Sequence, residues 1–277
     1  MPTPRLRADV ALVEAGLFPS REQARAAILA GKVRVGDRPL RKAGEPVAAD
    51  VVFQVEEGPR FVSRGGLKLE HALEVFELDV TGARCVDVGA STGGFTDCLL
   101  QHGAACVTAI DVGYGQLAWS LRNDPRVTVL ERTNIRSVES EALGTPFDLA
   151  VVDVSFIGLE IVLPAVLGLL STQGSIVALV KPQFEAGKGR VGKRGVVKDP
   201  LVHAEVLTSV GDAATALGLT VRGLAFSPIT GPEGNIEFWM WAARGGPATP
   251  EKPEAVVARA HERLGGAGAR PDSPQSE

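Results

Sequence analysis

Four charged residues stand where the pattern of the chain predicts a buried environment. Asp153, Lys181 and Glu237 each lie at one end of an apolar run typical of a buried strand, and Lys68 lies in a helix expected over residues 66–78. A charge in such a position needs a partner or a function, because burying an unpaired ion is costly. The two lysines and two carboxylates could neutralise one another as a structural cluster. They could equally align a reacting hydroxyl and steer its proton.

A glycine-rich loop with an acidic residue before it, DVGASTGG over residues 87–94, follows a strand expected at 85–88. Glycines let a backbone approach a ligand closely. In a dinucleotide-binding protein such a loop seats a pyrophosphate, which Asp87 would repel. An acid there suits the amino group and sulfonium of S-adenosylmethionine. The next strand ends in Asp111, 22 residues after Gly89, where a carboxylate can accept hydrogen bonds from ribose hydroxyls. The pattern therefore favours a methyl donor over a nicotinamide cofactor. The candidate cofactor residues are Asp87, Gly89, Ala90, Ser91, Gly93, Gly94, Asp111, Asn134 at the adenine side, and Phe156, for which simple core packing is an equal alternative.

Strands and helices alternate from residue 65 to residue 243. Strands are expected at 85–88, 107–111, 127–130, 149–153, 176–181, 220–226 and 236–243, with helices that include 95–101, 160–170 and 201–217. This order predicts an α/β fold of Rossmann-like type, with a mainly parallel seven-stranded sheet covered on both faces. Ligands bind such sheets beyond the carboxyl ends of the strands. We expect Trp119, Trp239 and Trp241 to belong to the core.

The first sixty residues predict a small α+β domain. A helix is expected over 5–15 and a second over 21–30, which the capping-box pattern Ser20 to Gln23 opens. Short strands are expected at 32–35 and 51–55. On the second helix Arg21 and Arg25 share one face. With Lys32 and Arg34 they would form a cationic surface for an RNA backbone, although an idle basic domain remains an alternative.

The charge of the chain is divided unevenly. The whole chain carries −4, but residues 1–68 carry +4 and the remainder −8, apart from a second basic run at 181–200. Localised basic segments on an acidic body suggest specific phosphate contacts, although two solvated faces would give the same pattern. The further candidates for RNA contact are Arg60, Arg64, Lys188, Arg190 and Lys193.

The same 277 residues argue against several other classes of protein. No apolar run approaches the roughly 20 residues of a membrane-spanning helix, and the N-terminus has no apolar signal segment. Three cysteines without a CxxC pair predict neither a disulfide framework nor a zinc site. We expect a cytoplasmic monomer without a metal. Its parts would be an RNA-binding domain over 1–59, a linker over 60–64, a catalytic domain over 65–245, and a tail over 246–277 that holds a helix at 254–264 and is disordered from 265.

At this level of detail the sequence resembles a known family. The order Lys68, Asp153, Lys181, Glu237 resembles the K-D-K-E tetrad of FtsJ-like ribose 2′-O-methyltransferases. The strings VSRGG, DVGASTGGFTDCLL, LVKPQFEAGKGRVGKRGVV and PITGPEGNIEF are similar to those of the TlyA family, over nearly the whole chain from Arg5 to Trp241. Residues 5–58 resemble the αL-type RNA-binding module of a small-subunit ribosomal protein and of bacterial pseudouridine synthases. One departure is Phe61, where the family usually has tryptophan.

The resemblance implies an activity and roles for these residues. The activity would be S-adenosylmethionine-dependent 2′-O-methylation of cytidine in ribosomal RNA within ribosomal subunits, of the large subunit or of both. Lys181 would accept or steer the hydroxyl proton, Asp153 would orient it, and Lys68 and Glu237 would surround it. Two alternatives stay open, an RNA-binding protein without catalysis and a membrane-lytic hemolysin.

Overall fold

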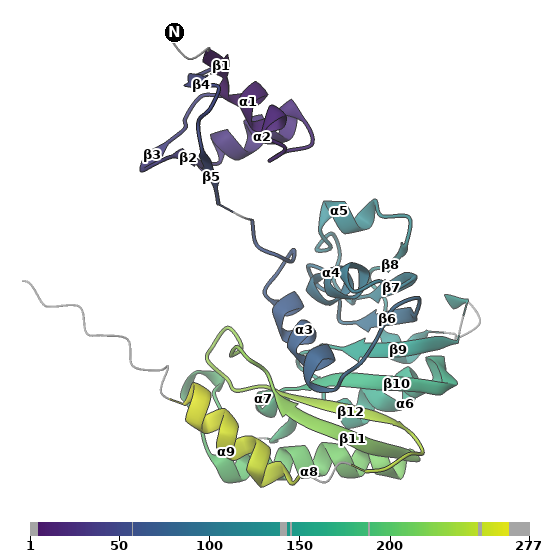
Figure 1. The fold of residues 1–277 in the computed structure, drawn as a ribbon. Coiled ribbons are helices and arrows are strands. Elements are labelled where there is room, and N and C mark those ends of the chain that lie inside the picture. Colours follow the sequence, from purple (N-terminus) through teal and green to yellow (C-terminus); the bar gives the residue numbers. More distant parts are fainter. Residues whose placement is uncertain are drawn as a thin grey trace, which may run out of the picture. The chain divides into compact units, whose positions relative to one another are not determined.

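The chain folds into two compact units that meet between Arg60 and Phe61 (Figure 1). The computed structural model describes residues 5–56, 58–138, 143–144, 146–187, 189–248 and 251–265. Lys188 and residues 266–277, with the disorder expected there, lie outside the described residues. Each unit has a hydrophobic core of its own.

The N-terminal unit has two helices and two small sheets. Helix α1 (Ala8–Glu14) packs on α2 (Arg21–Leu29). Its strands are β1 (Arg5–Arg7) paired with β4 (Pro46–Ala48), and β2 (Val33–Val35) between β3 (Arg38–Pro39) and β5 (Phe53–Val55).

Two predictions for this unit have different outcomes. The helix predicted over residues 21–30 is confirmed, and Ser20 Oγ accepts a hydrogen bond from the backbone N–H of Gln23 at 3.3 Å. The helix predicted over residues 5–15 is wrong at its start, because residues 5–7 pair as a strand with β4. That partner lies far along the chain, so local helical spacing could not reveal it.

The second unit is built on one seven-stranded sheet, as predicted. Its order is β11-β12-β10-β9-β6-β7-β8, and β12 alone runs antiparallel to its neighbours. The strands are β6 (Arg84–Val88), β7 (Cys106–Ile110), β8 (Val127–Leu130), β9 (Phe147–Val152), β10 (Leu170–Val180), β11 (Leu219–Phe226) and β12 (Phe238–Arg244).

Helices cover both faces of this sheet, because successive side chains of a strand point to opposite faces. In β6, Val86 and Val88 join the core cluster that contains residues of α6 (Leu159–Leu169), α8 (Pro200–Ala216) and α9 (Pro253–Leu264). Cys85 joins the cluster formed with α3 (Gly65–Val75) and α4 (Gly94–Gln101). Short helical segments follow at α5 (Trp119–Arg122), η1 (Ile135–Ser137), α7 (Pro182–Glu185) and η3 (Lys193–Gly195).

Phe61 belongs to the second of these clusters, with only 2% of its surface exposed. Residue 61 therefore packs within the second unit.

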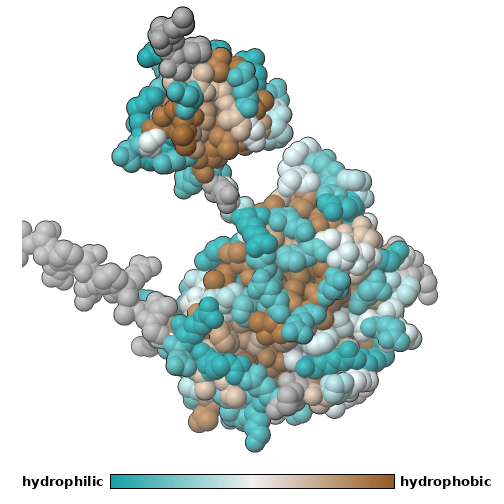
Figure 2. Space-filling model, viewed as in Figure 1, coloured by the Kyte–Doolittle hydropathy of each residue, from teal (hydrophilic) through white to brown (hydrophobic). Residues whose placement is uncertain are grey.

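The tryptophans differ in their exposure. Trp239 is fully buried and Trp241 packs against the core, but Trp119 is 77% exposed, so the core position predicted for Trp119 is wrong. The visible surface of the second unit mixes hydrophilic residues with apolar patches (Figure 2).

A pair of histidines, the buried His203 and the half-buried His261, joins α9 to α8. His203 Nδ1 lies 2.9 Å from His261 Nε2, and His203 Nε2 lies 3.1 Å from the carbonyl oxygen of Val197. A carbonyl only accepts hydrogen bonds, so Nε2 of His203 carries the proton and Nδ1 accepts from His261. Burial, and next the nearby His261, lower the pKa of His203 to about 4.

We expect this pair to weaken the fold in acid. Between the ordinary histidine pKa of 6.5 and about 4, the unfolded chain binds a proton that the folded chain does not, so stability falls as the pH falls through that window. At pH 4 the loss from this group reaches about 3 kcal/mol. Urea unfolding of the wild type and of His203→Gln, each at pH 7 and pH 4.5, measures this loss of stability, which should be larger in the wild type. A similar loss of stability in both proteins would contradict the assignment.

Candidate active site

The carboxyl edge of the sheet gathers the charged residues singled out in the sequence. Parallel strands β9 and β10 end there, at Val152 and Val180, immediately before Asp153 and Lys181. Strand β12 runs the other way, so it begins at this edge and Glu237 directly precedes it. Strand β12 therefore starts at the edge where β9 and β10 end (Figure 1), and it adds Glu237 to the charges that follow those two strands.

The four charges form two close ion pairs. Lys68 Nζ lies 2.5 Å from Glu237 Oε2, and Lys181 Nζ lies 2.6 Å from Asp153 Oδ1. Lys68 and Lys181 are each 9% exposed and Glu237 is 1% exposed. Lys181 Nζ also donates a hydrogen bond to Ser155 Oγ at 3.0 Å. Each buried lysine thus keeps a carboxylate within contact distance.

Both pairs lie at one cavity of about 230 Å³, which we call the acceptor cavity. Lys68 and Asp153 belong to its wall, and their partners Glu237 and Lys181 stand directly behind them. The structure thus brings together all four residues of the predicted tetrad. The remaining wall comes from the start of α3, the glycine-rich loop and the loop before β12, with Ser63, Arg64, Gly65, Gly89, Ala90, Ser91, Thr92, Gly94, Phe95, Thr230 and Pro232.

A second, larger cavity of about 440 Å³ adjoins the first and shares Gly89, Ser91 and Asp153 with it. Its wall is mostly apolar, and Asp111 contributes a carboxylate. The wall residues of this large cavity are Val88, Gly89, Ser91, Ile110, Asp111, Val112, Gln116, Thr133, Asn134, Ile135, Asp153, Val154, Ser155, Phe156, Ile157 and Val162. An apolar slot with a carboxylate at Asp111 and a second at Asp153, on the side shared with the acceptor cavity, fits a planar base joined to a sugar.

The glycine-rich loop lines both cavities and lies against the residue that follows β9. Gly89 has φ +88°, and a Cβ there would meet the carbonyl oxygen of Asp153 at 2.4 Å. Any side chain would push the loop away from Asp153, so glycine is required at this position. The backbone N–H groups of Gly89 and Ala90 donate to the carbonyl of Ile110, which ties the loop to β7.

Asp87 lies beneath the loop and in the wall of neither cavity. It is fully buried, and its Oδ2 accepts hydrogen bonds from the Thr96 N–H at 3.0 Å and the Thr96 hydroxyl at 2.7 Å. Burial raises the pKa of Asp87 to about 7. Gly93, with φ +96°, likewise faces Leu117 and Leu121 rather than a cavity. Asp87 and Gly93 thus line neither cavity and shape the loop and the start of α4, and their assignment as cofactor residues stays a prediction.

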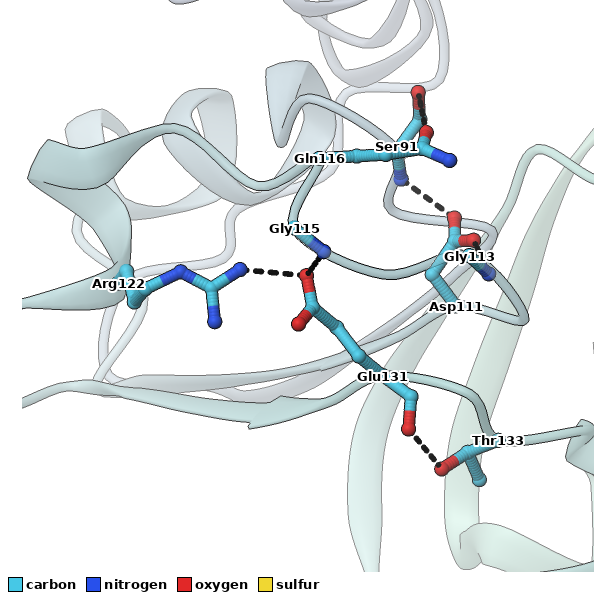
Figure 3. A network of polar contacts seen from close by, with 8 residues as sticks. All are labelled: Ser91, Asp111, Gly113, Gly115, Gln116, Arg122, Glu131 and Thr133. Atoms are coloured by element: carbon cyan, nitrogen blue, oxygen red, sulfur yellow. Dashed lines mark hydrogen bonds and ion pairs between the residues drawn. The ribbon is translucent and has the colours of Figure 1, made fainter.

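Asp111 is held by backbone donors on both of its carboxylate oxygens (Figure 3). Oδ2 accepts from the Ser91 N–H at 2.7 Å and Oδ1 from the Gly113 N–H at 2.6 Å. The loop after Asp111 is fixed in turn by Glu131, which accepts from the Gly115 N–H at 2.8 Å and pairs with Arg122 at 2.5 Å. The hydrogen bond from Arg122 lowers the pKa of Glu131. The carboxylate of Asp111 is thus fixed in orientation at the cavity wall.

Asn134 and Phe156 line the large cavity in different ways. The side chain of Asn134 accepts a hydrogen bond from the Arg136 N–H at 3.0 Å, which caps η1. Phe156 is 91% exposed, has φ +66° and lies with its ring centroid 4.9 Å from that of Phe184. The alternative of simple core packing for Phe156 is therefore wrong.

The basic residues predicted to contact RNA divide between the two units. Arg21, Arg25 and Arg34 are exposed in the N-terminal unit and Lys32 is half-buried, while Arg21 pairs with Asp9 at 3.1 Å. Arg60 ends that unit. In the second unit, Arg64 lines the acceptor cavity and Arg190 pairs with Glu205. Lys193 lies in η3, and its side chain, like all of Lys188, is outside the described residues.

Sequence reasoning missed several residues of the site. Ser155 contacts Lys181, Gln116 lies 3.3 Å from Ser91 through their side-chain oxygens, and Thr230 and Pro232 close the acceptor cavity. All four stand in loops without a periodic pattern. The position of Ser155 two residues after Asp153 was the one available signal.

Among the residues that the structure describes, no group of three or more His, Cys, Asp or Glu side chains is arranged to hold a metal ion. Within the same residues, no helix is both long and apolar enough to cross a bilayer.

The chain is similar to known methyltransferases along most of its length. Residues 61–244 match the family model described as FtsJ-like methyltransferase, and residues 6–52 match the S4 domain. A Mycobacterium tuberculosis protein named 16S/23S rRNA (cytidine-2′-O)-methyltransferase TlyA is 52% identical over 86% of this chain and 89% of its own. A Bacillus subtilis protein named putative rRNA methyltransferase YqxC is 48% identical over 95% of this chain and 97% of its own. The solved structure of a putative hemolysin from Streptococcus thermophilus is 43% identical, with a TM-score of 0.72, over 95% of this chain and 98% of that one. The chain therefore belongs to the TlyA family of FtsJ-like methyltransferases.

Proposed function

We propose that this protein transfers a methyl group from S-adenosylmethionine to the ribose 2′-hydroxyl of a cytidine in ribosomal RNA. The observation that carries the proposal is the pair of lysine–carboxylate contacts at the acceptor cavity, next to the larger cavity lined by Asp111. The names of the relatives supply the substrate class, since the M. tuberculosis protein is named for cytidines of 16S and 23S RNA. We extend this substrate to the present chain, acting on ribosomal subunits in the cytoplasm.

The large cavity suits S-adenosylmethionine by the chemistry of its wall. Apolar side chains such as Ile110, Ile135 and Ile157 can enclose the adenine, and the fixed carboxylate of Asp111 can accept hydrogen bonds from the ribose hydroxyls. When bound, S-adenosylmethionine supplies an electrophilic methyl group on a sulfonium. Asn134 and Phe156 complete this wall, and Gly89 and Ser91, which line both cavities, stand where the cofactor and the acceptor would meet.

The residues of the acceptor cavity would align the hydroxyl for displacement at the methyl carbon. Lys181, held by Asp153 and Ser155, would orient the hydroxyl oxygen as an ammonium donor, and only in its neutral amine form would it receive the hydroxyl proton. Lys68 and Glu237 would fix the opposite side of the ribose. Alignment of reacting groups alone supplies roughly 7–11 kcal/mol, so we expect positioning to outweigh proton removal in this site.

Replacing Asp111 is expected to weaken cofactor binding selectively. Asp111→Asn removes the charged acceptor proposed for the ribose hydroxyls, and its amide nitrogen stands against one of the two backbone N–H donors, Ser91 or Gly113, that hold the side chain in place. A hydrogen bond to a charged group contributes about 1.5–3 kcal/mol, which corresponds to a roughly 10- to 150-fold rise in Kd for S-adenosylmethionine. Isothermal titration calorimetry measures this Kd. The matched control is Asp124→Asn, at a half-buried loop aspartate that pairs with Arg126 and lines neither cavity. An unchanged Kd in Asp111→Asn would refute the role of Asp111.

The function is tested by transfer of tritiated methyl groups to purified ribosomal subunits that lack the modification. The full chain is incubated with 30S subunits, 50S subunits, 70S ribosomes and free RNA, and the modified ribose is mapped by blocked primer extension. We expect a cytidine of the large subunit to be methylated, and a cytidine of the small subunit as well. Salt-sensitive RNA binding without transfer would instead favour a binding protein. Lysis of erythrocytes by the purified chain would favour a hemolysin.

A further inference from the structure

Asn235 occupies a buried position two residues before Glu237, and only 2% of its surface is exposed. Its side chain makes two hydrogen bonds to a distant part of the chain. Oδ1 accepts from the Val197 N–H at 3.0 Å, and Nδ2 donates to the Gly195 carbonyl at 2.9 Å. The amide therefore binds the backbone of residues 195–197 through one accepted and one donated hydrogen bond, as the backbone of a neighbouring strand does.

The backbone bound by Asn235 lies near the end of a glycine-rich basic segment, residues 189–198, which we call the basic loop. Val197 is its buried residue (2% exposed), while Arg190, Arg194 and Lys198 are exposed. The carbonyl of Val197 lies 3.1 Å from His203 Nε2, so this residue is anchored on both sides. The start of the loop is also held, because Arg190 pairs with Glu205 and Val191 packs against the core, whereas its end at residues 195–197 is held by Asn235 and His203.

At its other side, Asn235 belongs to a tight turn over residues 230–237, which we call the acceptor loop. The carbonyl of Asn235 accepts from the Gly231 N–H at 2.9 Å. A Cβ on Gly231 would lie 2.7 Å from Glu237 Oε1, so the turn is packed directly on the catalytic-site carboxylate. Thr230 and Pro232 of the same turn form part of the acceptor cavity wall.

We propose that Asn235 is a positioning residue that holds the basic loop in register with the acceptor cavity. RNA phosphates bound by the exposed cations of the basic loop would then place the target ribose opposite Lys68 and Glu237. The inference rests on the proposed function, because it assigns Asn235 a role in presenting the RNA. It also explains why a buried amide, which needs all its hydrogen bonds satisfied, joins two loops rather than two strands.

Removing the amide tests this role. In Asn235→Ala the basic loop loses its two hydrogen bonds to the Asn235 side chain, while the large cavity proposed for the cofactor keeps every residue of its wall. Because small misplacements in an active site cost about 10²-fold, we expect kcat/KM for ribosomal subunits to fall by about that factor. The fall should appear both as a higher KM for the subunit and as a lower kcat. The Kd for S-adenosylmethionine should stay within about twofold of wild type.

A second variant separates positioning from loss of the fold. In Asn235→Asp, a protonated carboxyl has one accepting oxygen and one O–H donor, so it can restore both bonds, whereas the ionised form cannot donate to Gly195. The ratio of Asn235→Asp to wild-type kcat/KM should therefore rise as the pH is lowered from 8.5 to 6.5. Groups that both proteins share, such as Glu237 and His203, cancel in that ratio.

The control is Thr208→Ala, which removes a side-chain bond to the Ala204 carbonyl within α8, outside both loops, and should leave kcat/KM unchanged. An inactive wild type on every RNA substrate would overturn the proposed function itself. An active wild type with an Asn235→Ala variant within twofold of it would overturn only the role of Asn235. A parallel loss of cofactor affinity in Asn235→Ala would also overturn it, because the residue would then support the fold as a whole.

Discussion

Replacing Lys181 with alanine is expected to reduce methyl transfer about a thousandfold while leaving S-adenosylmethionine affinity within about twofold of wild type. Lys181 Nζ contacts Asp153 and Ser155 beside the acceptor cavity, so its loss removes the group that orients the hydroxyl and handles its proton. Such a group contributes typically 10²–10⁴-fold to a rate. Asp153 itself keeps its place in the wall of both cavities. Single-turnover transfer of tritiated methyl groups gives the rate, and calorimetry gives the affinity.

The control for this variant is Lys252→Ala, which removes an exposed lysine before α9 and should leave the rate unchanged. Lys181→Arg is informative as well. It keeps the charge, but a planar guanidinium distributes its donors differently from an ammonium group, so we expect most of the activity to stay lost. Turnover of Lys181→Ala close to that of wild type would refute the assignment of Lys181.

Breaking the ion pair between Lys68 and Glu237 is expected to lower both the stability of the fold and the rate of methyl transfer. A double variant separates these two effects. Lys68→Met leaves the carboxylate of Glu237, 1% exposed, without its partner 2.5 Å away. Removing one member of a buried pair costs about 3–5 kcal/mol of unfolding free energy. The double variant Lys68→Met/Glu237→Gln removes both charges, so most of that stability should return. Methyl transfer should stay lost in both proteins, because neither can fix the ribose.

Urea unfolding and the transfer assay, carried out on the same preparations, distinguish a catalytic pair from a structural one. If the pair served only to neutralise buried charge, activity would recover together with stability in the double variant. Recovery of both activity and stability would therefore contradict a catalytic role for Lys68 and Glu237 and would leave that role to Lys181 and Asp153.

Local patterns in the sequence were enough to predict much of this molecule. Apolar runs bounded by glycine and charge predicted all seven strands of the large sheet, because strand burial depends on side chains close together in the chain. The Ser20 to Gln23 pattern predicted the start of α2 for the same reason. The charged residues at strand ends and the glycine-rich loop also pointed to one edge of the sheet, since parallel strands share the direction in which they end.

Other features depend on partners that are distant in sequence, and only the tertiary structure decided them. The first three residues of the expected helix at 5–15 form a strand because β4 pairs with them. Asp87 turns beneath its loop to hold Thr96, and Trp119 lies exposed although its residue type suggested a core position. The sequence by itself determined which residues carry charge and roughly where each strand ends. How those charges pair, Lys68 with Glu237 and Lys181 with Asp153, was decided by tertiary folding. The partners stand 169 and 28 residues apart in the chain, and contacts between different elements follow from packing and leave no periodic pattern in the sequence.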